Sequence, residues 1–152
     1  MLLPVYLGML REGERVLAET FRTVSHGHVD EPDVYQTCMA LAKQCDAHVE
    51  DLDPIIERYG EQKDDEPDRL HATELPETRT GPLGLLRDLQ DLSLIGSFVD
   101  TTYTLVRQAA AALRDEDLMS HIDRCHGQTD TQIAWISTRM KQAAPQALIV
   151  AG

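Results

Sequence analysis

Apolar residues recur along most of the chain at alternating steps of four and three positions, which is the spacing of one face of an α-helix. Four such stripes are present, and polar segments separate them. Aromatic residues make up only 5% of the sequence, and Ala- and Leu-rich stretches favour helix over sheet. The pattern predicts one all-α domain, 1–152, with helices over about 4–25, 32–59, 82–113 and 116–144.

The connections between the predicted helices differ in length. The first and the last are short, so the helices that they join are expected to be antiparallel neighbours. Residues 61–80 have no apolar period, two prolines and many acids, and they predict a long loop. Twenty extended residues reach roughly 65 Å at about 3.3 Å each, enough to cross from one end of a bundle to the other. The sequence therefore predicts a four-helix bundle with a long crossover between its second and third helices.

Local signals suggest how the helices begin and end. Asp30 and Asp115 precede the second and fourth stripes and are expected to be N-caps, and Gly27 is expected to close the first helix. A kink or local break is expected at Pro54, and Pro145 should stop the fourth helix. The tail 146–152 is apolar and must be covered, either by its own bundle or by a second copy.

Charge and cysteine content narrow the expected partners. The 26 acidic and 14 basic residues give a formal charge of −12, which repels phosphate backbones and anionic membranes. No nucleic-acid or membrane partner is expected, and a homodimer is the favoured assembly. Three cysteines, an odd number, argue against a disulfide framework and for a reducing cytoplasm.

Polar residues interrupt the apolar stripes near the middle of each helix. Glu14 lies on the first stripe, His48 on the second and His126 on the fourth, where Asp123 precedes it by one turn. Asp100 flanks the third stripe. At 1.5 Å per residue these positions lie within roughly 6 Å of one common level, so their side chains can converge.

With these residues the chain resembles the ferritin-like superfamily of di-iron carboxylate proteins. In that family the first and third helices each give a Glu, and the second and fourth each give Glu-x-x-His. Here the fourth helix reads Asp-Arg-Cys-His, the second reads Cys-Asp-Ala-His, and the third offers only an Asp. The resemblance implies a ferritin-like antiparallel bundle with a metal site formed by Glu14, His48, Asp123, His126, Cys45 and Asp100.

Two interpretations of this pattern stay open. In the first, the incomplete motif binds a single Fe, Mn or Zn ion, with Cys45 favouring zinc, and serves a redox or metal-handling role. In the second, the histidines form a buried hydrogen-bond network with Glu14 and Asp100, and the protein acts by associating with itself or another protein. The sequence predicts no particular reaction or substrate. No Gly-rich phosphate loop, Ser nucleophile elbow or Cys-x-x-Cys pair occurs.

The remaining metal-competent side chains are expected to be incidental. His28 and His121 lie at a helix end or off the apolar stripes. Cys38 and Cys125 are expected to be small apolar core residues.

Overall fold

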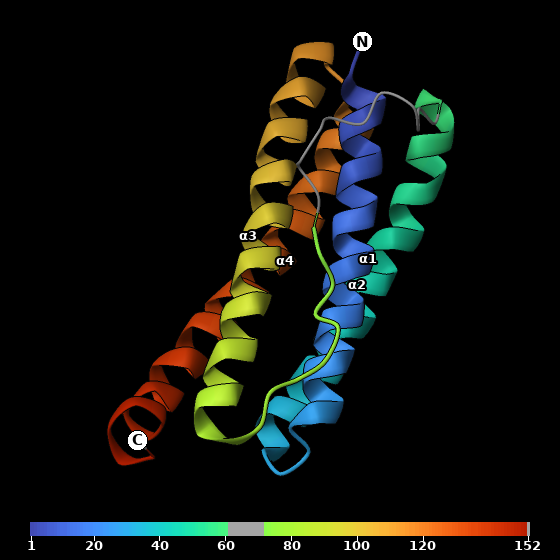
Figure 1. The fold of residues 1–152 in the computed structure, drawn as a ribbon. Coiled ribbons are helices and arrows are strands. Elements are labelled where there is room, and N and C mark those ends of the chain that lie inside the picture. The colour runs from blue at the N-terminus through green and yellow to red at the C-terminus, as the bar shows by residue number, and fades with distance from the viewer. Residues whose placement is uncertain (61–71, 152) are drawn as a thin grey trace.

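The computed structural model describes residues 1–60 and 72–151, which form helices and no strand (Figure 1). The bounds match the predicted ones to within two residues, and the prediction of an all-α four-helix bundle is confirmed. The elements are α1 (Leu3–Gly27), α2 (Pro32–Tyr59), α3 (Gly81–Leu113), α4 (Glu116–Pro145) and a π-helical turn, η1 (Gln146–Val150).

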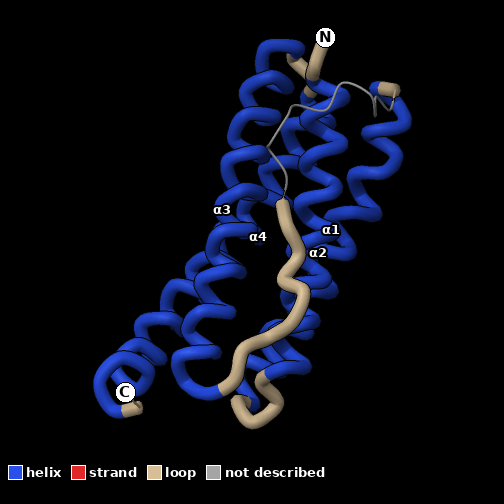
Figure 2. The backbone as a smooth tube through the Cα atoms, viewed as in Figure 1, coloured by secondary structure: helices blue, strands red, loops and turns tan. Residues whose placement is uncertain are grey.

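The helices form two antiparallel hairpins. α1 packs along α2, α3 packs along α4, and the two hairpins meet mainly where α1 lies against α3. α2 and α3 point in the same direction, so α2 ends and α3 begins at opposite ends of the bundle (Figure 1). Residues 72–80 run along the bundle to the end where α3 begins (Figure 2). Residues 61–71 lie outside the described part, so that portion of the crossover stays a prediction.

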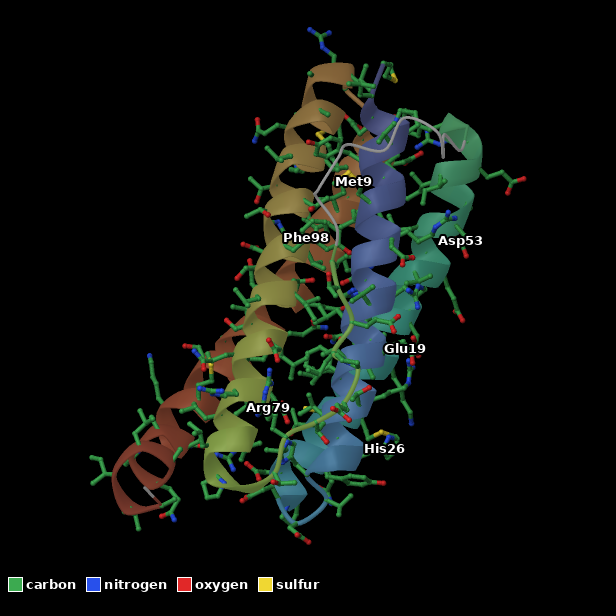
Figure 3. The ribbon with its side chains drawn as sticks, in the orientation of Figure 1. Met9, Glu19, His26, Asp53, Arg79 and Phe98 are labelled. Atoms are coloured by element: carbon green, nitrogen blue, oxygen red, sulfur yellow. The ribbon has the colours of Figure 1, made fainter. Side chains whose placement is uncertain are left out.

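The predicted apolar stripes form the core. Their members from all four helices, among them Phe21, Leu52, Val99 and Ile136, are almost completely buried in one continuous cluster. Charged residues such as Glu19 and Asp53 lie on the outer side of the α1–α2 hairpin (Figure 3). None of the helices in the described part of the chain is long and apolar enough to cross a bilayer.

Residues 72–80, which we call the strap, are held to the bundle by one buried carboxylate and by two more exposed ion pairs, Arg79 with Asp91 at 2.7 Å and Glu74 with Arg15 at 2.9 Å. Asp88 of α3 accepts hydrogen bonds from the backbone N–H of Arg79 (3.0 Å) and from its guanidinium (2.7 Å). The imidazole of His28, in the α1–α2 connection, lies 2.6 Å from the same carboxylate. A Cβ on Gly84 would stand 2.7 Å from the Arg79 backbone, so glycine is what allows the strap to lie this close. His28 is buried and holds the strap, whereas the sequence suggested an incidental role.

The helix ends follow some of the sequence signals and not others. Asp115 caps α4, as predicted, by accepting a hydrogen bond from the N–H of Leu118 at 3.1 Å. The prediction for Asp30 was wrong: α2 begins at Pro32, its N-cap is Glu31, and no side chain caps it. Asp30 stands one residue too early, because a capping side chain must reach the N–H groups two or three positions into the helix.

Neither Pro54 nor Pro145 interrupts the helical path. α2 continues through Pro54, where the expected break is absent, because the fixed φ of proline suits a helix and only one backbone hydrogen bond is lost. α4 includes Pro145 and leads directly into η1, so Pro145 does not stop the helical path. Of the tail, Ala147 is buried, but Leu148, Ile149 and Val150 are 62%, 80% and 70% exposed.

Replacing the cap of α4 should destabilise the fold. Asp115 also accepts hydrogen bonds from Tyr59 and Arg58, and the Tyr59 hydroxyl lowers the pKa of its carboxyl. We expect Asp115→Ala to lower the free energy of unfolding by about 0.5–2 kcal/mol, measured by urea denaturation at neutral pH. Because the folded-state pKa is lowered, this contribution is present above the ordinary pKa of an aspartate and is lost as the pH falls through the folded value.

Asp30→Ala is the matched control, since Asp30 carries the same sequence signal without making a cap. Its effect should stay within about 0.5 kcal/mol. Equal losses in the two variants would contradict the capping role of Asp115.

Candidate functional site

A carboxylate–imidazole pair lies at the centre of the bundle. Glu14 of α1 and His48 of α2 are 0% and 2% exposed, and a short hydrogen bond joins Glu14 Oε2 to His48 Nδ1. On the other side of the ring, His48 Nε2 lies 2.5 Å from Oε1 of Gln128 on α4. The line of three side chains therefore connects three helices through the core.

The surroundings of the pair raise the pKa values of both Glu14 and His48. Burial raises the pKa of Glu14, and the hydrogen bond and charge of His48 offset this only in part. Burial alone would lower the pKa of His48, but the hydrogen bond and charge of Glu14 outweigh it, so that pKa is raised as well. Whichever atom carries the shared proton, the two side chains stay bonded within a desolvated space.

Two oxygen atoms at this level make no well-formed hydrogen bond with the described residues, although Tyr103 lies close enough to Glu14 for its hydroxyl to help lower the pKa of that carboxyl. They are Glu14 Oε1 and the hydroxyl of Tyr103, a fully buried residue of α3. The charge of Glu14 adds to burial in raising the pKa of Tyr103, which reflects how near the two groups are. Buried polar atoms are nearly always paired, so the interior has unused capacity to bind at this level. We call Glu14, His48, Tyr103 and Gln128 the polar band.

A second group lies on the α3–α4 side of the band. His126 Nε2 is 2.6 Å from Asp100 Oδ1 and 3.8 Å from Asp130 Oδ1, and its ring stacks on Tyr103 with the centroids 5.5 Å apart. All three polar side chains are partly or largely exposed. Burial and a hydrogen bond that protonated Asp130 donates to Asp100 raise the pKa of Asp130, so the two carboxyl groups are close enough to share a proton.

A third group lies between α2 and α4. Asp51, His121 and Cys125 each offer one ligand atom, and these atoms all lie within 4.8 Å of one another. Cys125 Sγ is 3.6 Å from His121 Nε2. The Arg124 guanidinium bonds Asp51 at 3.0 Å and lies 3.3 Å from His121 Nδ1.

The structure separates the residues that the sequence grouped together. It pairs Glu14 with His48, and Asp100 with His126. Cys45 is buried apart from them, with its thiol 3.7 Å from Gln132. Asp123 is exposed and pairs with Arg107 at 2.8 Å. Two groups of three metal-competent atoms occur among the described residues, and neither includes Glu14, His48, Cys45 or Asp123. Their role as metal ligands stays a prediction.

Sequence reasoning missed Asp51, His121, Asp130 and the polar surroundings of Cys125. The spacing of His121 and Cys125, four residues apart, places both on one helix face and could have been noticed. Asp51 follows His48 by three residues and shares its side of α2 in the same way. His121 is buried, although it lies off the apolar stripe.

No protein-family model, curated protein or solved structure matches the chain. The resemblance to ferritin-like proteins therefore stays a prediction beyond the four-helix fold itself, and a proposal about function must rest on the geometry of these three groups.

The central pair should be energetically coupled. Glu14→Ala leaves the buried His48 without its carboxylate, and we expect it to lower the free energy of unfolding by about 1–3 kcal/mol in urea denaturation. Once either partner is absent, removing the other should cost less, so Glu14→Ala with His48→Ala should cost less than the sum of the single variants. Additive losses would show that the two groups are independent.

The control is Glu12→Ala, on the same helix. Glu12 is an exposed residue paired with Arg15, and its replacement should change stability by no more than about 0.5 kcal/mol.

Proposed function

We propose that the protein binds a metal ion inside its helical bundle and serves a metal-handling role. The observation that supports this most directly is the buried Glu14 carboxyl beside an imidazole and the Tyr103 hydroxyl, where Glu14 Oε1 and the Tyr103 oxygen make no well-formed hydrogen bond. A bundle that only needed apolar packing would gain nothing from a desolvated carboxylate, because burying it costs free energy unless it is paired.

The orientation of His48 supports the same proposal. Histidine ligands usually donate the hydrogen of one ring nitrogen to a carboxylate, which fixes the ring and leaves the other nitrogen free for the metal. Glu14 occupies Nδ1 of His48 in this way, and Nε2 points towards α4, where it contacts Gln128. An ion bound there would have to replace the Gln128 oxygen that contacts Nε2 at 2.5 Å.

The nature of the donor atoms argues against a di-iron centre. Such a centre needs several carboxylates that bridge two ions. Glu14 is the one carboxylate of the polar band, and the nearest cysteines favour a softer ion than iron or manganese. A single ion of the zinc type agrees best with this composition.

The metal content of the protein tests the proposal. Protein purified without chelator, or stripped and then incubated with Zn(II), Mn(II) or Fe(II), should hold about one ion per chain in elemental analysis after dialysis, as one site predicts. His48→Ala should weaken binding, by roughly ten- to a hundredfold if the pair acts only indirectly on the ligands. His26→Ala, an exposed histidine outside the three groups, should change nothing. Protein that holds no ion under any of these conditions would rule the proposal out.

A second candidate function, association, is favoured by the tail. Leu148, Ile149 and Val150 are among the most exposed large apolar side chains of the described chain, and Leu83 at the start of α3 is 45% exposed. A space of about 460 Å³ lies between the start of α3 and the end of α4 with the tail. Its lining residues include Leu83, Leu86, Met140 and Leu148. Apolar groups gathered in this way are typical of contact surfaces.

The tail can be tested without shortening the chain. If it mediates self-association, the variant with Leu148, Ile149 and Val150 all changed to Ser should have the mass of a single chain by light scattering, whereas the unchanged protein should have that of a dimer. The same mass for both proteins would contradict self-association through the tail. Leu105→Ser, an exposed apolar position elsewhere on α3, serves as the control.

A further inference from the structure

The group between α2 and α4 has the dimensions of a metal site. In a tetrahedral zinc site the metal–sulfur distance is about 2.3 Å and the metal–nitrogen distance about 2.0–2.1 Å, so a sulfur and a nitrogen ligand stand about 3.6 Å apart. Cys125 Sγ and His121 Nε2 are 3.6 Å apart already. Two of the three ligand atoms thus have the separation of bound ligands without any rearrangement of α4.

The charges of the group also match those of a divalent ion. Asp51 is a carboxylate, and a metal-bound cysteine is a thiolate, so together they supply two negative charges. Burial, followed by the charge of Glu14, raises the pKa of Cys125 to about 11, so the thiol is protonated before an ion arrives and loses its proton on binding. Burial and the Arg124 charge lower the pKa of His121, which keeps its imidazole neutral, the form that binds metals.

Arg124 competes with an ion for the Asp51 carboxylate. Its guanidinium bonds Asp51 at 3.0 Å and lies 3.3 Å from His121 Nδ1. It neutralises the same carboxylate that an ion would neutralise, and its side chain is 59% exposed, so it can leave towards solvent. Asp51 is exposed as well, which gives an ion access from outside the bundle.

We infer that Asp51, His121 and Cys125 bind one divalent ion of the zinc type, and that this ion displaces Arg124 from the Asp51 carboxylate. One sulfur, one nitrogen and one oxygen donor favour zinc, cobalt or a similar borderline ion over magnesium, calcium or manganese. Three protein ligands leave a fourth position open, as in zinc sites that exchange a ligand. The inference rests on the proposed metal binding, and it places the single ion on these three ligands instead of on His48 Nε2.

Direct titration tests the assignment. Protein stripped of metal is titrated with Co(II), whose thiolate complexes absorb strongly in the near ultraviolet, and with Zn(II) in competition with a chromophoric chelator. The unchanged protein should give the thiolate–cobalt band at one equivalent. Cys125→Ser should abolish the band, and His121→Ala and Asp51→Asn should each weaken Zn(II) binding at least about tenfold, because each removes one of three ligands. Cys38→Ser, a buried cysteine outside the group, should retain both band and affinity.

Arg124 gives a test in the opposite direction. Removing an exposed competing ion pair should strengthen Zn(II) binding, and Arg124→Gln is expected to bind about two- to fivefold more tightly. Arg107→Gln is the control, since Arg107 pairs with Asp123 outside the group. A cavity or a general loss of fold would weaken binding, so tighter binding in Arg124→Gln cannot come from damage to the structure.

The outcomes separate the two proposals. If an ion binds without the thiolate band and with unchanged affinity in the Cys125, His121 and Asp51 variants, the assignment is wrong and metal binding elsewhere in the bundle stands. If no ion binds to the unchanged protein, both are wrong. Asp51 lies on the surface, so its variant keeps the test valid even if a buried substitution prevents folding, which circular dichroism would reveal.

Discussion

The hydrogen bond between Glu14 and His48 constrains the whole interior. A carboxylate and an imidazole lie in the middle of an apolar core, where each alone would be costly to bury. Their bond joins α1 to α2, and Gln128 extends the line to α4. This directional contact fixes how the helices are rotated about their axes and how far they are shifted along them, which apolar packing alone does not do. The two groups of metal-competent side chains have their places because α4 is held in this register.

The sequence predicted the fold well because helical periodicity is a local property. The four stripes needed no knowledge of long-range contacts, and Glu14 and His48 were recognised as core positions for the same reason. The third group was missed because it depends on how α2 and α4 are rotated against each other. Asp51 looks like an ordinary surface residue until Arg124 and His121 are placed beside it.

The same limit explains the errors at the helix ends. Asp30 and Asp115 look alike in sequence, and only the register of the following helix decides that one caps and the other does not. The buried Asp88 could not be foreseen either, since its partners come from the strap and from the α1–α2 connection, 9 and 60 residues away. Contacts made by irregular segments leave no periodic trace in a sequence.

Asp88 couples three segments at one end of the molecule. This carboxylate binds the first hairpin and the strap to the first turns of α3, and Arg79 also pairs with Asp91 of α3. Helix ends in a bundle ordinarily fray one at a time. Here, displacing any one of the three segments exposes the Asp88 carboxylate, to which the others are bound. This end should therefore open in one cooperative step, and its backbone amides should exchange their hydrogens with solvent together.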